Sequence, residues 1–194
     1  SNFYPILEQM IPMVIQMATR ADQLELQHCS LFLISEAVSH YPQIISDESR
    51  FVALYSLSSN LMQIDNIRIV KSSFYLLSSL FKAFKSNEMK SFLVSQFDNI
   101  WSLYQAFFES NKFEKDNISL LKILFDSINN LIEHLPKESF EPYSVILEFS
   151  HMNLKQEIRP NYSPLFIAMN SSLIISIVNS TQNVIDQYVS EIME

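Results

Sequence analysis

Apolar positions recur along most of this 194-residue chain at intervals of three and four, the spacing that places side chains on one face of an α-helix. The sequence shows no sustained alternation of apolar and polar residues, which would mark half-buried strands. Prolines and short polar stretches separate the apolar segments. The pattern therefore predicts helices over residues 4–20, 24–41, 48–63, 66–84, 88–109, 115–135, 141–156, 163–181 and 184–193, with a kink at Pro12.

The polar positions of these helices repeat along the chain. The helix 24–41 ends in Ser39–Pro42 (SHYP), and the helix 115–135 ends 94 residues later in Glu133–Pro136 (EHLP). A shift of 43 residues relates the first polar stripe to the second. The stripes comprise Glu25, His28, Ser35, Glu36 and Ser39, then Arg68, Lys71, Ser78, Ser79 and Lys82, then Ser119, Lys122, Asn129, Asn130 and Glu133. The opposite face is apolar, as in Ile118, Leu121, Phe125, Ile128 and Ile132.

A two-helix unit with a period of about 40–47 residues is typical of HEAT repeats. We therefore predict an all-α fold, a HEAT-repeat α-solenoid in which antiparallel helix pairs form a right-handed superhelix. One segment would span residues 1–194, with about four helix pairs and a terminal helix, as a fragment of a longer array. In a solenoid the polar stripes of every second helix line a concave wall. The alternative is a compact helical bundle, which has no reason to repeat a polar stripe at fixed spacing.

Composition excludes several classes of function. The chain has no glycine, where average usage would supply about 14. Phosphate-binding loops and the nucleophile elbow of hydrolases need glycine for positive φ or for close approach to a ligand. Hydrophobic residues make up 48% of the chain, which is enough to bury a large core. These counts make an α/β nucleotide-binding enzyme close to excluded, and they name no function.

Charge and cysteine content add further limits. Asp and Glu number 21 against 13 Lys and Arg, a net charge of −8, so the chain lacks the basic clusters that bind nucleic acid and suits basic partners. The single cysteine, Cys29, excludes an internal disulfide and fits a reducing compartment. The longest apolar runs are short, such as Leu31–Ile34. We therefore expect neither a membrane-spanning helix nor a signal peptide.

Two pairs of neighbouring residues could suggest chemistry. His28 and Cys29 lack zinc-site spacing, and the pattern places Cys29 on the apolar face and His28 on the polar face, so we expect no metal. Glu133 and His134 are adjacent in a helix and therefore point about 100° apart, which does not make an acid–base pair. The aromatic residues of helix 88–109 predict core packing, with an apolar groove for phenylalanine-rich partners as the alternative. They are Phe92, Phe97, Trp101, Tyr104, Phe107 and Phe108.

One polar stripe is a candidate partner-binding surface. Asp126, Asn129, Asn130 and Glu133 follow the i, i+3, i+4, i+7 spacing of a single helix face, and Glu36 is a further acidic position on an equivalent helix. Carboxylates and amides on such a face can bind an extended basic peptide through charge-assisted and backbone hydrogen bonds. The alternative is an ordinary solvated face.

Two segments of the chain resemble the importin-β superfamily, the β-karyopherins. They are Leu24–Pro42 and Asp116–Ser150, and the second contains a helix, a proline-ended turn and the opening of the next helix at Phe140, Pro142 and Tyr143. The same order continues through residues 162–179 and a short helix at 184–193. The arrangement is most similar to the N-terminal third of the importin beta-three type of receptor.

The resemblance implies a nuclear transport receptor that shuttles between cytoplasm and nucleus and that has neither catalytic residues nor a cofactor. Such receptors bind cargo proteins with basic signals, and Ran GTPase loaded with GTP, mainly on the concave second helices of their repeats. Phenylalanine-glycine nucleoporins dock between the first helices on the outer side. This chain departs from the family in its lack of glycine and its wealth of Ser and Asn, so individual contact residues are not transferred. Two alternatives remain open: a HEAT-repeat scaffold subunit of a phosphatase or chromosome complex, and the helical flank of a large enzyme.

Overall fold

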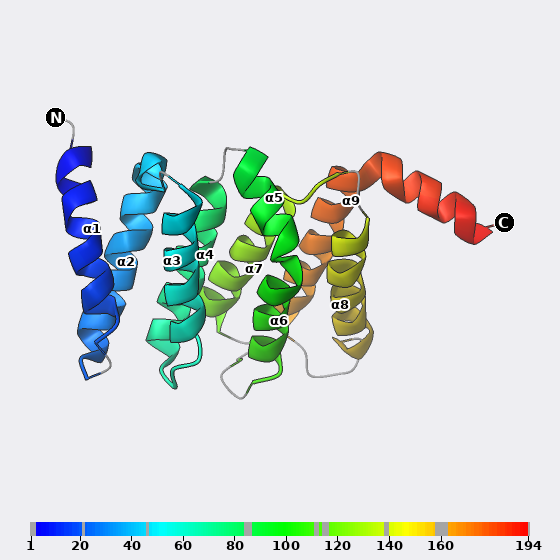
Figure 1. Cartoon of the computed structure of the whole chain (residues 1–194). Helices are drawn as coiled ribbons and strands as arrows, with labels where there is room; N and C mark the ends of the chain where they lie inside the picture. The colour runs from blue at the N-terminus through cyan, green and yellow to red at the C-terminus, as the bar shows by residue number, and fades with distance from the viewer. Residues whose placement is uncertain are drawn as a thin grey trace. The chain divides into compact units, whose positions relative to one another are not determined.

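The structure is a computed structural model that describes residues 3–20, 22–45, 47–83, 87–110, 113, 117–137, 140–157 and 163–193. Within these ranges every regular element is a helix (Figure 1), so the predicted all-α class is confirmed. The chain divides into two compact units, unit 1 (Ser1–Met89) and unit 2 (Lys90–Glu194). This division neither confirms nor contradicts the predicted single repeat segment. Each part of a repeat array contacts only its neighbours, so such an array can also divide into compact units.

Unit 1 consists of two helical hairpins. Its elements are α1 (Tyr4–Ala18), α2 (Leu24–His40), the short 3-10 helix η1 (Pro42–Ile44), α3 (Glu48–Leu61) and α4 (Ile67–Ala83). The helix α1 packs against α2, and α3 packs against α4. Asp47 begins α3 by accepting a hydrogen bond from the backbone N–H of Arg50 at 2.9 Å, which satisfies a donor that the helix itself leaves free. The fully buried rings of Phe51, Phe74 and Phe81 fill the interior.

The two second helices of unit 1, α2 and α4, run side by side in the same direction (Figure 1). Glu25 pairs with Arg68, 43 positions later. His28 Nδ1 lies 2.7 Å from the hydroxyl oxygen of Ser72, 44 positions later. At the other end Ser39 donates to the hydroxyl of Ser79 at 2.9 Å, a separation of 40. A nearly constant separation means that the two helices are parallel and in register, so the 43-residue shift found in the sequence corresponds to direct contacts.

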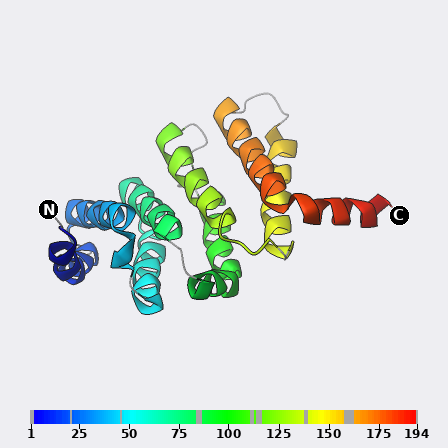
Figure 2. The same cartoon turned by 90° about the horizontal axis from the view of Figure 1, so that it is seen from above.

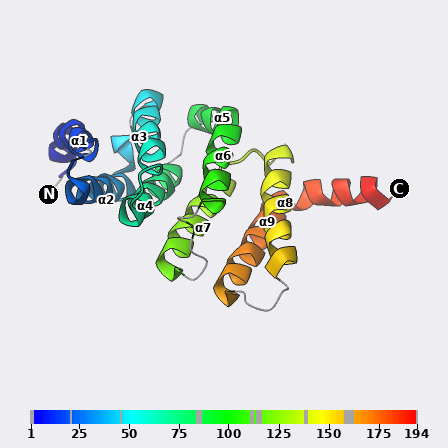
Figure 3. The ribbon, with the colours of Figure 1, turned by 90° about the horizontal axis from the view of Figure 1, so that it is seen from below.

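Unit 2 is also built of hairpins. Its helices are α5 (Asn87–Ser95), which spans the boundary, α6 (Phe97–Phe108), α7 (Ile118–Ile132), α8 (Glu141–Glu157) and α9 (Pro164–Met193). Tyr104 donates its hydroxyl to Ser127 at 2.9 Å, and the ring centroid of Phe108 lies 6.2 Å from that of Phe125. The later residue of α6 contacts the earlier residue of α7, so the two helices are antiparallel. The helix α9 packs against both α8 and α7 (Figure 3).

The interior of unit 2 is rich in aromatic rings, and the core packing predicted for helix 88–109 is confirmed for four of its six aromatic residues, whereas Phe92 and Phe108 are half-buried. Phe97, Trp101, Tyr104 and Phe107 are buried there. The indole of Trp101 meets Phe149 of α8 edge to face, with ring centroids 5.3 Å apart. An edge-to-face pair aligns the positive ring edge with the negative ring face, which adds to the stabilisation that burial gives.

Two predicted helix boundaries differ from the structure. The predicted helix 88–109 is broken at Gln96, whose φ of −103° and ψ of 4° leave the helical region. Neither proline nor glycine stands at this break, so the sequence carries no breaker there. The predicted helices 163–181 and 184–193 follow one another without a loop in α9, but a kink at Thr181, where φ is −123° and ψ is 19°, separates them near the predicted boundary (Figure 2). In unit 1, α1 continues through Pro12.

The helix α9 includes a stretch, Pro164–Thr181, that is long and apolar enough to cross a membrane, with 28% of it buried. The same stretch places Phe166, Leu173 and Ile177 in the interior of unit 2. Asn170 is also buried there, where it donates to the carbonyl of Phe166 at 2.8 Å and accepts from Asn153 of α8. These contacts pack one face of the stretch into the interior of unit 2, and we describe it as part of that unit. The expectation of no membrane insertion stays a prediction.

Candidate binding surface

The outward face of α7 carries three of the predicted partner-binding residues. Asp126 and Glu133 are exposed, and Asn129 is half-buried. The opposite face fixes this orientation, because Leu121, Phe125 and Ile128 are buried in the interior of unit 2, as predicted. At the start of the helix the side chain of Asn117 accepts a hydrogen bond from the N–H of Leu120 at 3.1 Å. We call the outward residues the α7 row; they are Ser119, Lys122, Asp126, Asn129 and Glu133.

Two positions of α7 differ from the prediction. Asn130 is only 6% exposed, so it does not line the outward face with its neighbour Asn129. One residue advances a helix by about 100°, which turns Asn130 toward the interior, where its polar side chain has an interaction partner. Ile118, predicted on the apolar face, is 58% exposed because it is the first residue of the helix.

The two carboxylates of the α7 row are free to bind. Neither Asp126 nor Glu133 has an ion-pair or hydrogen-bond partner among the described residues. Glu133 also stands at the C-cap of α7, where the last helical carbonyls carry roughly half a negative charge. The negative potential of the row is therefore strongest between Asp126 and the end of the helix. Lys122 lies on the other side of Asp126.

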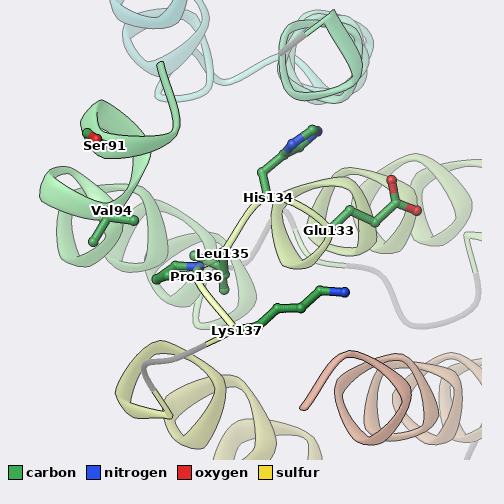
Figure 4. A pocket seen from close by; sticks show the side chains of 7 residues that line it. All are labelled: Ser91, Val94, Glu133, His134, Leu135, Pro136 and Lys137. Carbon is green, nitrogen blue, oxygen red and sulfur yellow. The ribbon is translucent and has the colours of Figure 1, made fainter. Parts of the chain in front are cut away.

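A hollow of about 540 Å³ adjoins the end of the α7 row (Figure 4). Ser91 and Val94 of α5 line one side of it, and the turn that follows α7 lines the rest. The turn supplies Glu133, His134, Leu135, Pro136 and Lys137. Its apolar members can hold the methylene stem of a long side chain, while its polar members can contact the charged end.

The turn beside this hollow is held in place from α8. The buried hydroxyl of Tyr143 donates to the backbone carbonyl of Leu135 at 2.9 Å. Pro136 and Tyr143 were noted in the sequence only as part of a proline-ended turn and a helix opening. The sequence did not predict that Ser91 and Val94 line the hollow. They belong to α5, about 40 residues before the turn, and the sequence pattern merged α5 with α6.

Glu36, the remaining candidate, lies in unit 1 and is engaged there. Its carboxylate accepts a hydrogen bond from the Tyr75 hydroxyl at 2.5 Å and lies 3.5 Å from Nε2 of His40. The hydrogen bond to Glu36, partial burial and the negative charge of Glu36 together raise the pKa of Tyr75 above its usual value of 10.0. Glu36 therefore joins α2 to α4 in addition to any role in binding.

Several other polar-stripe residues of unit 1 are buried, contrary to prediction. Ser35, Ser78 and Ser79 are at most 5% exposed. Ser35 donates to the carbonyl of Leu31 at 2.8 Å, and Ser79 accepts from Ser39. A serine hydroxyl is small and finds such partners within a helix or across a helix pair, so burial costs it little. The outward stripe of unit 1 is narrower than the sequence pattern indicates.

His28 and Cys29 occupy different environments, but not those predicted. Cys29 is exposed rather than on the buried face, and His28 is half-buried against Ser72. In the part of the chain that the structure describes, no three His, Cys, Asp or Glu side chains are grouped to hold a metal ion.

Comparison with known proteins finds no matching family model, no matching curated sequence and no matching solved structure. The α7 row and the adjoining hollow combine two exposed, unpaired carboxylates with a concave shape.

Proposed function

We propose that this chain is a protein-binding segment of a HEAT-type helical-repeat protein, and that the α7 row binds basic partner segments. The observation that carries the proposal is a pair of exposed carboxylates, Asp126 and Glu133. Neither carboxylate has a partner among the described residues, and Glu133 lines the hollow. The parallel, in-register contacts of α2 with α4 support the repeat architecture, because stacked repeats place equivalent helices side by side.

An extended peptide fits the dimensions of this row. Seven residues of α-helix separate Asp126 from Glu133, which is about 10 Å along the axis. A chain in the polyproline II conformation covers about 9 Å in three residues and turns every third side chain to the same side. Two basic side chains three positions apart can therefore each meet a carboxylate, and half-buried Asn129 lies between these carboxylates. The hollow beside Val94 then accepts the stem of the basic side chain that pairs with Glu133.

The more specific proposal is a segment of a nuclear transport receptor. It rests on the resemblance of Leu24–Pro42 and Asp116–Ser150 to β-karyopherins. It assigns as partners cargo proteins with basic signals, Ran GTPase and phenylalanine-glycine nucleoporins, and it places the protein in the cytoplasm and nucleus. It requires no catalytic step, since a receptor of this kind acts by binding.

A pull-down with Ran tests the specific proposal. Ran loaded with GTP or with GDP is immobilised and exposed to the purified chain. Retention on the GTP form alone supports the transport receptor. Equal retention on both forms, or retention on neither, contradicts it and leaves the broader proposal of basic-peptide binding to be tested separately.

One observation favours a HEAT scaffold subunit as the second candidate. An apolar strip runs from the N-cap of α1 along part of the helix, with Phe3, Ile6, Met10 and Met13 between 37% and 55% exposed. Their spacing of three and four places them on one helix face. A subunit that is held permanently in a complex covers such a face. Absence of Ran binding, together with stable co-purification of one partner at high salt, would favour this function.

A further inference from the structure

A second hollow, of about 310 Å³, lies in unit 2 and is lined mainly by aromatic rings. Its lining residues come from α6, from the segment after α6, from α8 and from the start of α9. They are Phe108, Glu109, Phe113, Phe149, Met152, Asn153 and Phe166. We call this hollow the aromatic pocket.

The rings of the aromatic pocket meet at angles instead of lying in one stack. The centroids of Phe108 and Phe113 are 4.9 Å apart with their planes at 75°. Phe108 and Phe149 are 4.5 Å apart at 45°, and Phe113 and Phe166 are 5.6 Å apart at 56°. Inclined rings form corners, so a ligand in the pocket meets ring faces from more than one direction.

These rings are only partly used by the core of unit 2. Phe108, Phe113 and Phe149 are half-buried, whereas Phe166 is 1% exposed and closes the pocket from within. Met152, at the rim, is 48% exposed. Half-buried aromatic rings around a hollow leave part of their faces available to a ligand.

Of the described residues that line the pocket, one can carry a charge, and that charge is negative. Glu109 is exposed and has no interaction partner among the described residues. Asn153 is engaged, because its amide donates to the side-chain oxygen of Asn170 at 3.1 Å. Among the described residues, the pocket therefore offers the negative faces of aromatic rings and one carboxylate, and no cation lines it.

We propose that the aromatic pocket binds a methylated ammonium group, specifically the trimethylated lysine side chain of a partner protein. The positive charge of such a group is spread over its methyl groups, which pack against ring faces and are attracted by them. The group has no N–H to satisfy, so entering an aromatic pocket costs it less than it costs an unmodified ammonium. Glu109 adds a carboxylate at the entrance. The choice of a protein-borne ligand deepens the protein-binding function proposed above and rests on it.

The probe tetramethylammonium tests the pocket without relying on that function. Trp101 is the only tryptophan of the chain, and its ring contacts Phe149 of the pocket, so its fluorescence can report binding. Tetramethylammonium chloride is titrated into the full chain, with tert-butanol as a neutral molecule of similar shape and sodium chloride as the ionic-strength control. We expect saturable binding of the cation, about fivefold or more tighter than the alcohol. Equal binding of the two, or no binding of the cation, overturns the proposal.

Variants then locate the site. Phe113→Leu keeps an apolar side chain but removes a ring, and Glu109→Gln removes the charge. Each should weaken tetramethylammonium by about threefold or more, while Glu141→Gln, an exposed carboxylate at the start of α8, should leave the affinity unchanged. Circular dichroism confirms folding. Unchanged affinity in both folded pocket variants places the cation elsewhere and overturns the assignment.

A peptide arm tests the source of the ligand. A peptide that carries one trimethyl-lysine is compared with the same peptide carrying unmodified lysine. We expect the methylated peptide to bind about fivefold or more tighter, and Phe113→Leu to remove the difference. If tetramethylammonium binds but the methylated peptide gains nothing, the pocket serves a small methylated amine and the protein-borne ligand is wrong. Failure of this arm does not affect binding of basic peptides to the α7 row, which is measured separately.

Discussion

Phe125 lies on the inward face of α7, where it contacts rings from two other segments of unit 2. Its centroid is 6.2 Å from that of Phe108 and 5.9 Å from that of Phe166. The ring is 1% exposed. We predict that Phe125→Ala lowers the free energy of unfolding by about 3–5 kcal/mol, because it removes a buried ring and leaves a cavity.

Chemical denaturation followed by circular dichroism measures this change. Ile118→Ala on the same helix is the matched control. Ile118 is 58% exposed, so its truncation should change the free energy of unfolding by no more than about 0.5 kcal/mol. Equal effects of the two substitutions would show that the inward and outward faces of α7 are misassigned.

Tyr75 gives a prediction about pH. Its hydrogen bond to Glu36, its partial burial and the charge of Glu36 raise its pKa in the folded chain above the ordinary value of 10.0. Folding therefore favours the neutral phenol. The resulting stability is complete below the ordinary pKa and is lost as pH rises through the raised pKa. The difference in unfolding free energy between the wild type and Tyr75→Phe should be constant below about pH 9 and should shrink above about pH 10.

Urea denaturation of both proteins at several pH values tests this prediction. Other tyrosines titrate in both proteins, so they cancel in the comparison. A difference that stays the same from about pH 8 to about pH 11 would show that the Tyr75–Glu36 hydrogen bond does not contribute to stability.

Individual residues show where the sequence was informative. The inward positions Leu121, Phe125 and Ile128 were predicted correctly, because burial of large apolar side chains sets the orientation of a helix. Asn130 and Ser79 were misplaced because polarity alone does not indicate exposure. A small polar side chain can be buried wherever it finds a partner, and that partner comes from the packed structure.

At the scale of elements, Asp47 shows how side chains set helix boundaries. Its carboxylate accepts from the N–H of Arg50 and from the hydroxyl of Ser49 at 2.6 Å. We predict that Asp47→Ala destabilises unit 1 by about 1 kcal/mol through loss of the cap of α3. Glu48→Ala, one residue later and equally exposed, is the control and should cost less. The urea midpoint measures both, and equal effects would exclude a specific capping role for Asp47.

Helix positions were largely predictable, but one break was not. The period of three and four together with the prolines placed seven of the predicted helices within a few residues of their observed ends, as in α2 and α4. The break at Gln96 lacks a proline or glycine, and Trp101 of α6, shortly after it, packs edge to face against Phe149 of α8 with ring centroids 5.3 Å apart. Packing of that kind involves residues distant in sequence, so a local pattern carries no trace of it. The two hollows escaped prediction for the same reason, since each collects residues from several helices.

At the scale of the whole molecule, the chain carries a net charge of −8, and each of its two units is built of helix pairs. The repeat shift of 43 residues was visible in the sequence and recurs as physical contacts between α2 and α4. Binding is assigned to the α7 row, because its carboxylates are exposed and unpaired, whereas Glu36 is already engaged with Tyr75. The central claim is therefore that local charge on α7, and not net charge alone, binds a basic partner.

Titration of a labelled basic import-signal peptide tests this claim most directly. The double variant Asp126→Lys, Glu133→Lys is compared with a matched control, Asp98→Lys, Glu141→Lys, which makes the same change in net charge at exposed positions elsewhere in unit 2. Circular dichroism verifies folding. Reversing two exposed charges in contact with the peptide should weaken binding about tenfold at 0.1 M salt, and the control should weaken it much less.

The loss should shrink at 1 M salt, because the Debye length falls from about 10 Å to about 3 Å. We therefore predict that the α7 variant loses much of its affinity for the peptide at low salt and that this loss shrinks at high salt. The control variant should not show this loss. Equal affinities of the wild type and the folded α7 variant at low salt, or equal weakening in the control, would contradict it.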